Sequence, residues 1–279
     1  MKELLKQVLK KLNIYYLLQS RYHSVITFFT RIYYRLSYSK YCNSGFECNF
    51  CRARFQKFVP DFPSPRIRNA IEKYHVIAGY GENVFCPQCL CKNRERLVKV
   101  LLTDYLDLSG KKILHFSPEK NVFNYIKNKA SVITVDIEPG FYKSIDNEVN
   151  KAELTQLNFG DNEFDLIICN HILEHIPDDL KAMSELYRVL KNDGYAIVQV
   201  PFSETLSATI EDRHINDPAL QEKLFGQKDH VRIYALKDYL NRLNKTGFKV
   251  RLISSQELQQ YSNYALQKNE CAIIAQKKE

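Results

Sequence analysis

The sequence contains no apolar run long enough to cross a membrane. A spanning helix needs about 20 consecutive apolar residues, and Arg21, Arg31 and Arg35 interrupt the most hydrophobic N-terminal stretch. The chain also shows no secretory signal, and eight cysteines without such a signal are typical of a reducing compartment. We therefore expect a cytoplasmic protein that does not span a bilayer, and 279 residues allow one large or two small domains.

Acidic residues are almost absent from positions 1–41. This segment has eight Lys and Arg but only Glu3 as an acid, a net charge of +7, whereas the whole chain carries +8. The near-neutral remainder argues against a core that grips nucleic-acid phosphates. Leu5, Val8, Leu12 and Tyr16 form one helical stripe, so we predict a basic amphipathic helical arm. Its apolar stripe either packs on the protein's own body or a second protomer, or makes peripheral contact with an anionic membrane surface.

Four cysteines occur in two C-x2-C pairs. Each pair offers two thiolates at a spacing that suits a Zn-S4 site, although the intervening loop is longer than usual. Cys42 and Cys91 lie nearby, and Cys91 could take the place of Cys89. We predict a structural zinc ion in a zinc-ribbon-like module over residues 42–96, followed by a helix on which Arg94 and Arg96 face solvent or are paired. The predicted zinc ligands are Cys48, Cys51, Cys86 and Cys89.

The most informative stretch covers residues 164–201. Residues 164–169 form an apolar run without alternation, as in a strand buried on both faces of a parallel sheet. A helix that starts with Pro177 and ends near residues 192–194 follows, and residues 195–200 form a second buried strand. The carboxyl edge of this unit presents four polar side chains, namely Asn170, His171, Glu174 and His175.

This unit resembles the fourth strand, following helix and fifth strand of class I S-adenosylmethionine-dependent methyltransferases of the type 11-like group. There "F-D-apolar-apolar" with "H-x-L-E-H" recurs together with "E-L-x-R-x-L-K-x-x-G". The C-P-x-C and R-x-R-L sequences are similar to a bacterial group with a zinc ribbon before the catalytic domain. The resemblance covers residues 46–275. It implies an α/β fold with a Rossmann-like seven-stranded sheet over residues 97–279, and S-adenosylmethionine as the cofactor.

Glycine is missing from the turn after the first predicted strand, residues 112–116. The family carries an acidic residue and a G-x-G loop there, and His115, Ser117 and Glu119 occupy those places, with Ser117 as the expected helix cap. The cofactor has no pyrophosphate, so a glycine cradle is less necessary than in dinucleotide folds. A carboxylate such as Glu119 can offset its ammonium and sulfonium charges. We expect all three residues to contact the cofactor.

Four further residues complete the predicted cofactor site. Asp136 ends the second strand, residues 132–136, where an acid can accept both ribose hydroxyls. The resemblance places Glu153 at the adenine amino group and the backbone N–H of Leu154 at the ring, within a predicted third strand and loop over residues 152–159. Asn170 lies at the edge of the fourth strand.

Three histidines are candidate catalytic bases. His171 and His175 follow the fourth strand, but their spacing could equally make His175 a buried support. His230 lies with Asp229 and Arg232 in a polar insertion, residues 202–234, that we expect to form a substrate lid.

The predicted function is methyl transfer to a small-molecule or glycan-type acceptor at oxygen. No N-P-P-Y-type sequence follows the fourth strand, which argues against exocyclic amines of bases as acceptors. Two alternatives stay open: an RNA methyltransferase that docks RNA through the zinc ribbon and arm, and a non-catalytic scaffold with the methyltransferase fold.

Overall fold

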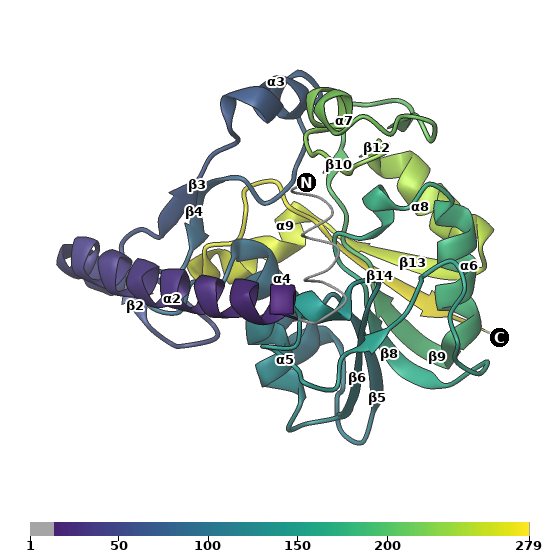
Figure 1. Cartoon of the computed structure of the whole chain (residues 1–279), viewed down its shortest axis with the longest axis horizontal. Helices are drawn as coiled ribbons and strands as arrows, with labels where there is room; N and C mark the ends of the chain where they lie inside the picture. The colour runs from purple at the N-terminus through teal and green to yellow at the C-terminus, as the bar shows by residue number, and fades with distance from the viewer. Residues whose placement is uncertain (1–13, 279) are drawn as a thin grey trace.

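The centre of the protein is a seven-stranded sheet with helices on both faces, in a computed structural model that describes residues 14–278 (Figure 1). The strand order is β13-β14-β9-β8-β5-β6-β7. Neighbours from β9 to β7 are parallel, whereas β14 is antiparallel to both β9 and β13. This arrangement confirms the predicted fold class. The strands are β5 (Lys112–Phe116), β6 (Ser131–Asp136), β7 (Asn150–Lys151), β8 (Phe164–Ile168), β9 (Leu190–Ile197), β13 (Phe248–Ile253) and β14 (Ala272–Lys277).

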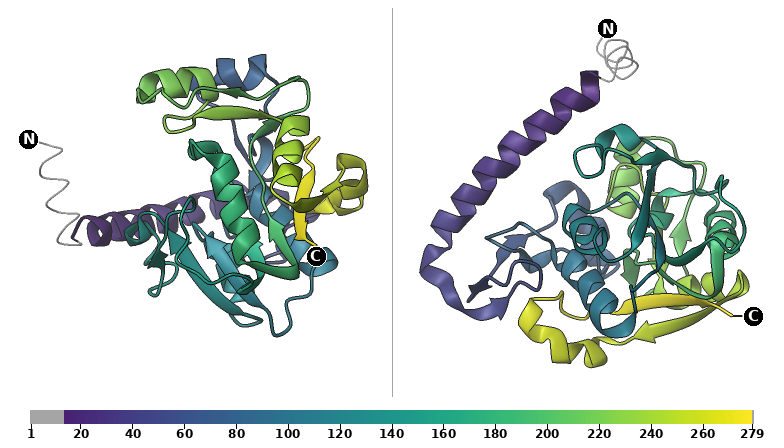
Figure 2. Two further views of the ribbon diagram at one scale, coloured as in Figure 1. Left: turned by 90° about the vertical axis from the view of Figure 1, so that its right-hand side faces the viewer. Right: turned by 90° about the horizontal axis from the view of Figure 1, so that it is seen from below.

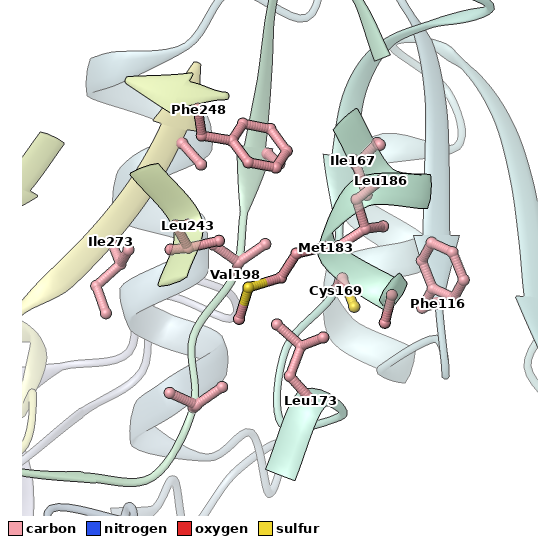
Figure 3. Close-up of a cluster of buried hydrophobic side chains, with 14 of the residues drawn as sticks. Phe116, Ile167, Cys169, Leu173, Met183, Leu186, Val198, Leu243, Phe248 and Ile273 are labelled. Carbon is pink, nitrogen blue, oxygen red and sulfur yellow. The ribbon is translucent and has the colours of Figure 1, made fainter. Parts of the chain in front are cut away.

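Two helical layers cover the sheet, because alternate side chains of each strand point to opposite faces. Leu114 and Phe116 pack on the side of α6 (Asp179–Val189) and α8 (Leu236–Lys245), whereas Ile113 packs on the other side. Figure 3 shows the first cluster, which includes Met183 of α6 and Leu243 of α8. The other face is covered by α4 (Asn93–Val100), η2 (Leu101–Tyr105), α5 (Lys120–Ile126), α9 (Ser255–Leu258) and η5 (Gln259–Tyr264).

Several predicted boundaries are shifted. The helix predicted to begin at Pro177 starts at Asp179, because the Asp178 side chain accepts a hydrogen bond from the backbone N–H of Lys181 and so caps it. Residues 192–194 do not end that helix. They lie inside β9, which begins at Leu190 with a register irregularity. Ser117 does not cap α5, whose N-cap is Glu119.

The cysteine-rich module precedes the sheet. It contains η1 (Ser39–Tyr41), β1 (Cys42–Glu47), β2 (Arg54–Phe55), β3 (Val59–Asp61), α3 (Pro65–Lys73) and β4 (Gly81–Phe85). The prediction that Arg96 faces solvent or is ion-paired is wrong, because its side chain is fully buried and its guanidinium donates to five backbone carbonyls. These carbonyls belong to the module and to Tyr264 and Ala265, so Arg96 fastens the module to the C-terminal part of the chain.

The insertion after β9 forms a small sheet of its own. β12 (Arg232–Ala235) lies between β10 (Phe202–Ser203) and β11 (Ile210–Glu211), and α7 (Pro218–Phe225) packs on α3 of the cysteine-rich module. Arg232 is fully buried and donates to Glu211 and to the carbonyls of Leu173, Ile176 and Pro177. It therefore anchors the insertion to the main domain. That the insertion forms a substrate lid stays a prediction.

The N-terminal helix α2 (Ile14–Ser37) extends away from the body (Figure 2). Near its start, the Tyr16 ring packs edge-on against the Phe141 ring of η3 (Pro139–Phe141), with the ring centroids 5.2 Å apart. None of its residues is buried, although this contact places one residue of the predicted stripe, Tyr16, against the described body. The predicted stripe residues Leu5, Val8 and Leu12 lie outside the described residues. Within residues 14–278, no helix is both long and apolar enough to span a membrane.

Candidate functional site

A cavity of about 980 Å³ opens at the carboxyl ends of the parallel strands. Its floor includes residues that follow β5, β6, β7 and β8, and its other walls come from the cysteine-rich module and the insertion. In open parallel sheets ligands bind at this edge. Two segments that are distant in sequence, around Tyr80 and around Gln227, therefore close over the edge at which the sequence predicts a cofactor.

Asp136 is held in place at this edge by two hydrogen bonds. Its Oδ2 accepts from Ser117 Oγ at 2.6 Å, and its Oδ1 accepts from the backbone N–H of Glu138 at 2.7 Å. Ser117 has a φ of 44°, in the left-handed region where glycine is the usual residue. The first turn therefore has the backbone conformation that the missing glycines would favour, and its side chain orients the acid.

Glu119 also lines the cavity, whereas His115 does not. His115 is fully buried behind it, with its Nε2 atom 3.0 Å from Glu119 Oε2. Burial raises the pKa of Glu119, but the hydrogen bond from His115 and nearby positive charge outweigh it, so the pKa lies below its ordinary value. Glu119 is thus a carboxylate that can face a cation, and His115 acts only through it.

The remaining predicted cofactor residues lie around the same cavity. Glu153, Leu154 and Asn170 all line it. The third strand, β7, ends at Lys151, so residues 152–159 form a loop instead of the strand start that we expected. Asn170 is buried, and its Nδ2 atom has no hydrogen-bond partner among the described residues. An unpaired buried donor of this kind calls for a ligand.

The three candidate bases converge on one carboxylate, Glu174, which our selection of site residues omitted. Glu174 and His175 belong to η4 (Leu173–His175), and His230 reaches them from the insertion. Glu174 Oε1 lies 3.7 Å from His171 Nδ1 and 4.0 Å from His230 Nε2. The sequence does contain a signal for this role, because Glu174 is the acid of the H-x-L-E-H run.

Burial controls the protonation of these groups. It lowers the pKa of His171, and it lowers that of His230 to about 4, so both rings are neutral near pH 7. For Glu174 burial acts in the opposite direction, but the neighbouring imidazoles, with His171 first among them, bring its pKa well below the ordinary value. The cluster therefore combines a carboxylate with imidazoles that have free lone pairs.

Two cations of the cysteine-rich module also line the cavity, and sequence reasoning missed both. Arg94 and Lys92 lie at the start of α4, next to the wall that contains Glu119. Arg94 Nε is buried without a hydrogen-bond partner among the described residues, whereas the side chain as a whole is half-buried. No feature of the local sequence separates Arg94 from Arg96, because only the fold decides which of the two reaches the cavity.

The cysteine cluster fits a structural zinc ion. The Sγ atoms of Cys48, Cys51, Cys86 and Cys89 all lie within 4.8 Å of one another. The Cys48–Cys89 and Cys51–Cys86 distances are 3.6 and 3.7 Å, close to the edge of a tetrahedron with Zn–S bonds of about 2.3 Å. Cys91 lies 3.2 Å from Cys48 but is not part of this mutually close set. Four thiolates would hold the ion with no open position, which is a folding role and not a chemical one.

The rim also fits S-adenosylmethionine. Asp136 offers a fixed carboxylate for ribose hydroxyls, Glu119 an anion for the charged methionine part, and Asn170 an unpaired donor. When bound, this cofactor supplies an activated methyl group on a sulfonium. The residues that would hold it line the same cavity as the imidazole cluster, and Asn170 directly precedes His171.

Comparisons with known proteins agree with this description. Residues 118–198 match the family model of a methyltransferase domain. Over 78 residues the chain is 40% identical to an uncharacterized protein of Methanocaldococcus jannaschii, a match that covers 28% of this chain and 33% of that protein. The chain therefore spans about a third of the length of the curated relative that it matches.

Two solved structures are similar in fold. One is the complex of the Haloferax volcanii Trm112 methyltransferase activator with a candidate methyltransferase, with a TM-score of 0.48, 11% identity, and 65% of this chain and 89% of that chain covered. The other is a candidate methyltransferase of Bacillus halodurans, with a TM-score of 0.45, 16% identity, and 66% and 99% covered.

Proposed function

We propose that this chain, which carries the domain of the class I S-adenosylmethionine-dependent methyltransferases, transfers a methyl group to a hydroxyl oxygen of a small-molecule or glycan-type acceptor. The observation that carries the proposal is the cavity of about 980 Å³, which cofactor-type residues and an imidazole cluster line together. Ligand pockets typically measure ~300–1,000 Å³, so this one has room for a nucleoside and a second ligand.

The cofactor would lie along the rim formed by β5, β6 and β8. Asp136 would bind the ribose, Glu153 and Leu154 the adenine, and Glu119 the ammonium group. Arg94 is a cation that the methionine carboxylate could meet, because Arg94 lines the same cavity. This placement leaves the part of the cavity near Glu174 for the acceptor.

The acceptor would meet His171, His175 and His230. Methyl transfer from a sulfonium needs mainly alignment and the exclusion of water, but a sugar-type hydroxyl also has to lose its proton. His171 lines the cavity beside Asn170 and is neutral near pH 7, so its ring can accept that proton. The insertion and the cysteine-rich module, which form the other walls of the cavity, would exclude water from it.

The test uses purified full-length protein and S-adenosylmethionine with a labelled methyl group. Size-fractionated cell extract, with and without nuclease or glycosidase treatment, supplies the acceptors. The proposal predicts label in a low-mass or glycan fraction as a methyl ether, and no label with D136A. Label that enters RNA, and is lost on nuclease treatment, would instead support the RNA methyltransferase. Binding of neither S-adenosylmethionine nor S-adenosylhomocysteine would support the scaffold.

We also propose that α2 rests on an anionic membrane surface. Residues 14–41 contain Arg21, Arg31, Arg35 and Lys40 but no acid, and the large apolar side chains of α2, among them Leu18, Phe28 and Phe29, are exposed. Apolar burial together with attraction to anionic lipids favours such a helix at an interface. The charge pattern suits a lipid surface better than a second copy of α2, because two copies would repel each other.

Vesicle sedimentation tests this second proposal. The full-length chain should sediment with vesicles that contain phosphatidylserine but not with phosphatidylcholine vesicles. Replacing Arg21, Arg31 and Arg35 by Gln should abolish sedimentation, while K249Q on the exposed side of β13 should not. Equal binding by all variants, or a concentration-dependent dimer in place of lipid binding, would exclude the membrane contact.

A further inference from the structure

Glu174, His175 and His230 form a group outside the cysteine module whose donor atoms all lie within 4.8 Å of one another. The first two come from η4, directly after the rim of β8, and the third comes from the insertion just before β12. The rings of His175 and His230 lie edge to face with centroids 4.6 Å apart. Folding thus brings together two imidazoles and a carboxylate on the wall of the cavity.

From this geometry we propose that Glu174, His175 and His230 bind a divalent first-row transition metal ion that holds the acceptor hydroxyl. The inference deepens the proposed methyl transfer and rests on it for the identity of the acceptor. Two nitrogens and one carboxylate oxygen are a donor set typical of Zn²⁺, Mn²⁺ and Fe²⁺ sites with open coordination positions. Such a site differs from the cysteine cluster, which has no position left for a substrate.

The buried carboxylate supplies an independent observation. Glu174 is 1% exposed, and its Oε2 atom has no hydrogen-bond partner among the described residues. The ion pairs found for Glu174 within residues 14–278 involve only histidines. A buried carboxylate without a strong cationic partner is unfavourable. A bound metal ion would supply both a partner for Oε2 and the missing positive charge.

The surroundings of the two rings suit metal ligation. Asp229 Oδ1 lies 3.5 Å from His175 Nδ1, and an outer carboxylate of this kind favours the tautomer in which Nε2 carries the free lone pair. His230 directs its Nε2 atom toward Glu174, at 4.0 Å. Metal bonds of about 2.0–2.2 Å require donor atoms roughly 3–3.5 Å apart, so small side-chain rotations would close the site.

The metal would act on the acceptor and not on the cofactor. Coordination of a hydroxyl lowers its pKa, and the proton would pass to the neighbouring His171. The oxygen would then form a bond to the methyl carbon while the carbon–sulfur bond breaks. The electron pair of that bond stays on sulfur, which gives neutral S-adenosylhomocysteine and a methyl ether. No oxidant or reductant is needed.

Metal binding can be measured without any acceptor. Full-length protein with zinc in its cysteine site is treated with a mild chelator, and Mn²⁺ binding is followed by the loss of the free-ion electron paramagnetic resonance signal. Zn²⁺ is titrated in parallel by metal analysis. We expect one further equivalent of Mn²⁺ or Zn²⁺ per wild-type chain. E174Q and H230A should each weaken this binding at least tenfold, whereas H214A, an exposed histidine of the same insertion, should bind like wild type.

Binding of S-adenosylhomocysteine at wild-type affinity by E174Q and H230A would show that these variants fold. The inference fails if wild-type protein binds neither ion beyond its cysteine-site zinc, or if both variants bind like H214A. Methyl transfer that persists in a chain without this second ion would leave the proposed function intact and reject the metal. A bound ion in a chain that methylates no acceptor would retain the metal site and reject the transfer.

Discussion

Ser117 Oγ donates a 2.6 Å hydrogen bond to Asp136 Oδ2, across the ends of β5 and β6. The second oxygen of Asp136 is fixed by the backbone of Glu138. The carboxylate is therefore oriented before any ligand arrives, which reduces the ordering that binding requires. The two strands that would hold the cofactor are linked through this pair of side chains.

The first prediction concerns this hydrogen bond. In S117A, Asp136 loses one of its two partners, so we expect affinity for S-adenosylhomocysteine to fall about threefold to tenfold, in line with a single hydrogen bond of ~0.5–1.5 kcal/mol. Isothermal titration calorimetry measures the change. S184A serves as the control, since Ser184 is exposed and its hydroxyl donates to the Leu180 carbonyl within α6. Unchanged affinity for S-adenosylhomocysteine in S117A would show that Ser117 does not contribute to cofactor binding.

The second prediction concerns Arg96. R96A leaves carbonyls of Asn83, Val84 and Ala265 unpaired in a buried region, so we expect the free energy of unfolding to fall by about 3–5 kcal/mol. R68A is the control, because Arg68 is half-exposed and has only a long contact with Glu72, and it should cost less than ~1 kcal/mol. Urea unfolding followed by circular dichroism gives both values. Similar losses in the two variants would show that Arg96 is no structural anchor.

The third prediction separates Cys89 from Cys91. Because Cys89 lies within the mutually close set and Cys91 does not, C89S should lose the structural zinc and C91S should retain one equivalent. Metal analysis of the purified proteins measures the zinc content per chain directly. C42S provides a matched cysteine outside the set. Zinc retained in C89S and lost in C91S would assign the fourth ligand to Cys91.

The fourth prediction is a pH dependence. Burial raises the pKa of Glu270 to about 8, against an ordinary 4.5, and the hydrogen bond from the backbone of Cys271 offsets this only in part. Between these two values the folded carboxyl keeps its proton while the unfolded one releases it. The free energy of unfolding therefore falls as pH rises through this range.

Glutamine does not ionise, so E270Q should not show this fall in the free energy of unfolding. From the raised pKa of Glu270 we expect E270Q to be more stable than wild type near roughly pH 8 and similar to it near roughly pH 5. Chemical denaturation at a series of pH values measures the difference, and E148Q on the exposed surface is the control. Parallel stability curves for wild type and E270Q would show that Glu270 ionises normally in the folded protein.

Buried runs such as residues 164–169 and the end of β6 at Asp136 are local signals, so the residues themselves predicted these strands. The seven-stranded sheet was predicted from the resemblance to a known family. Sequence reasoning could not predict which side chains converge. Arg94 and Arg96 are two positions apart on one helix, yet one lines the cavity and the other is buried among carbonyls. The meeting of His230 with Glu174 depends on how the insertion folds back, and no local pattern encodes that.

The most direct test of the central claim, that a nucleoside cofactor lies at the rim of the sheet and is held by Asp136, is calorimetric titration of the full-length chain with S-adenosylhomocysteine. We predict one binding event for wild-type protein, weakened at least about tenfold, or ~1.4 kcal/mol, in D136A and also in the nearly isosteric D136N. Absence of heat and of a thermal shift in the wild type, or equal affinity in all three proteins, would contradict the account.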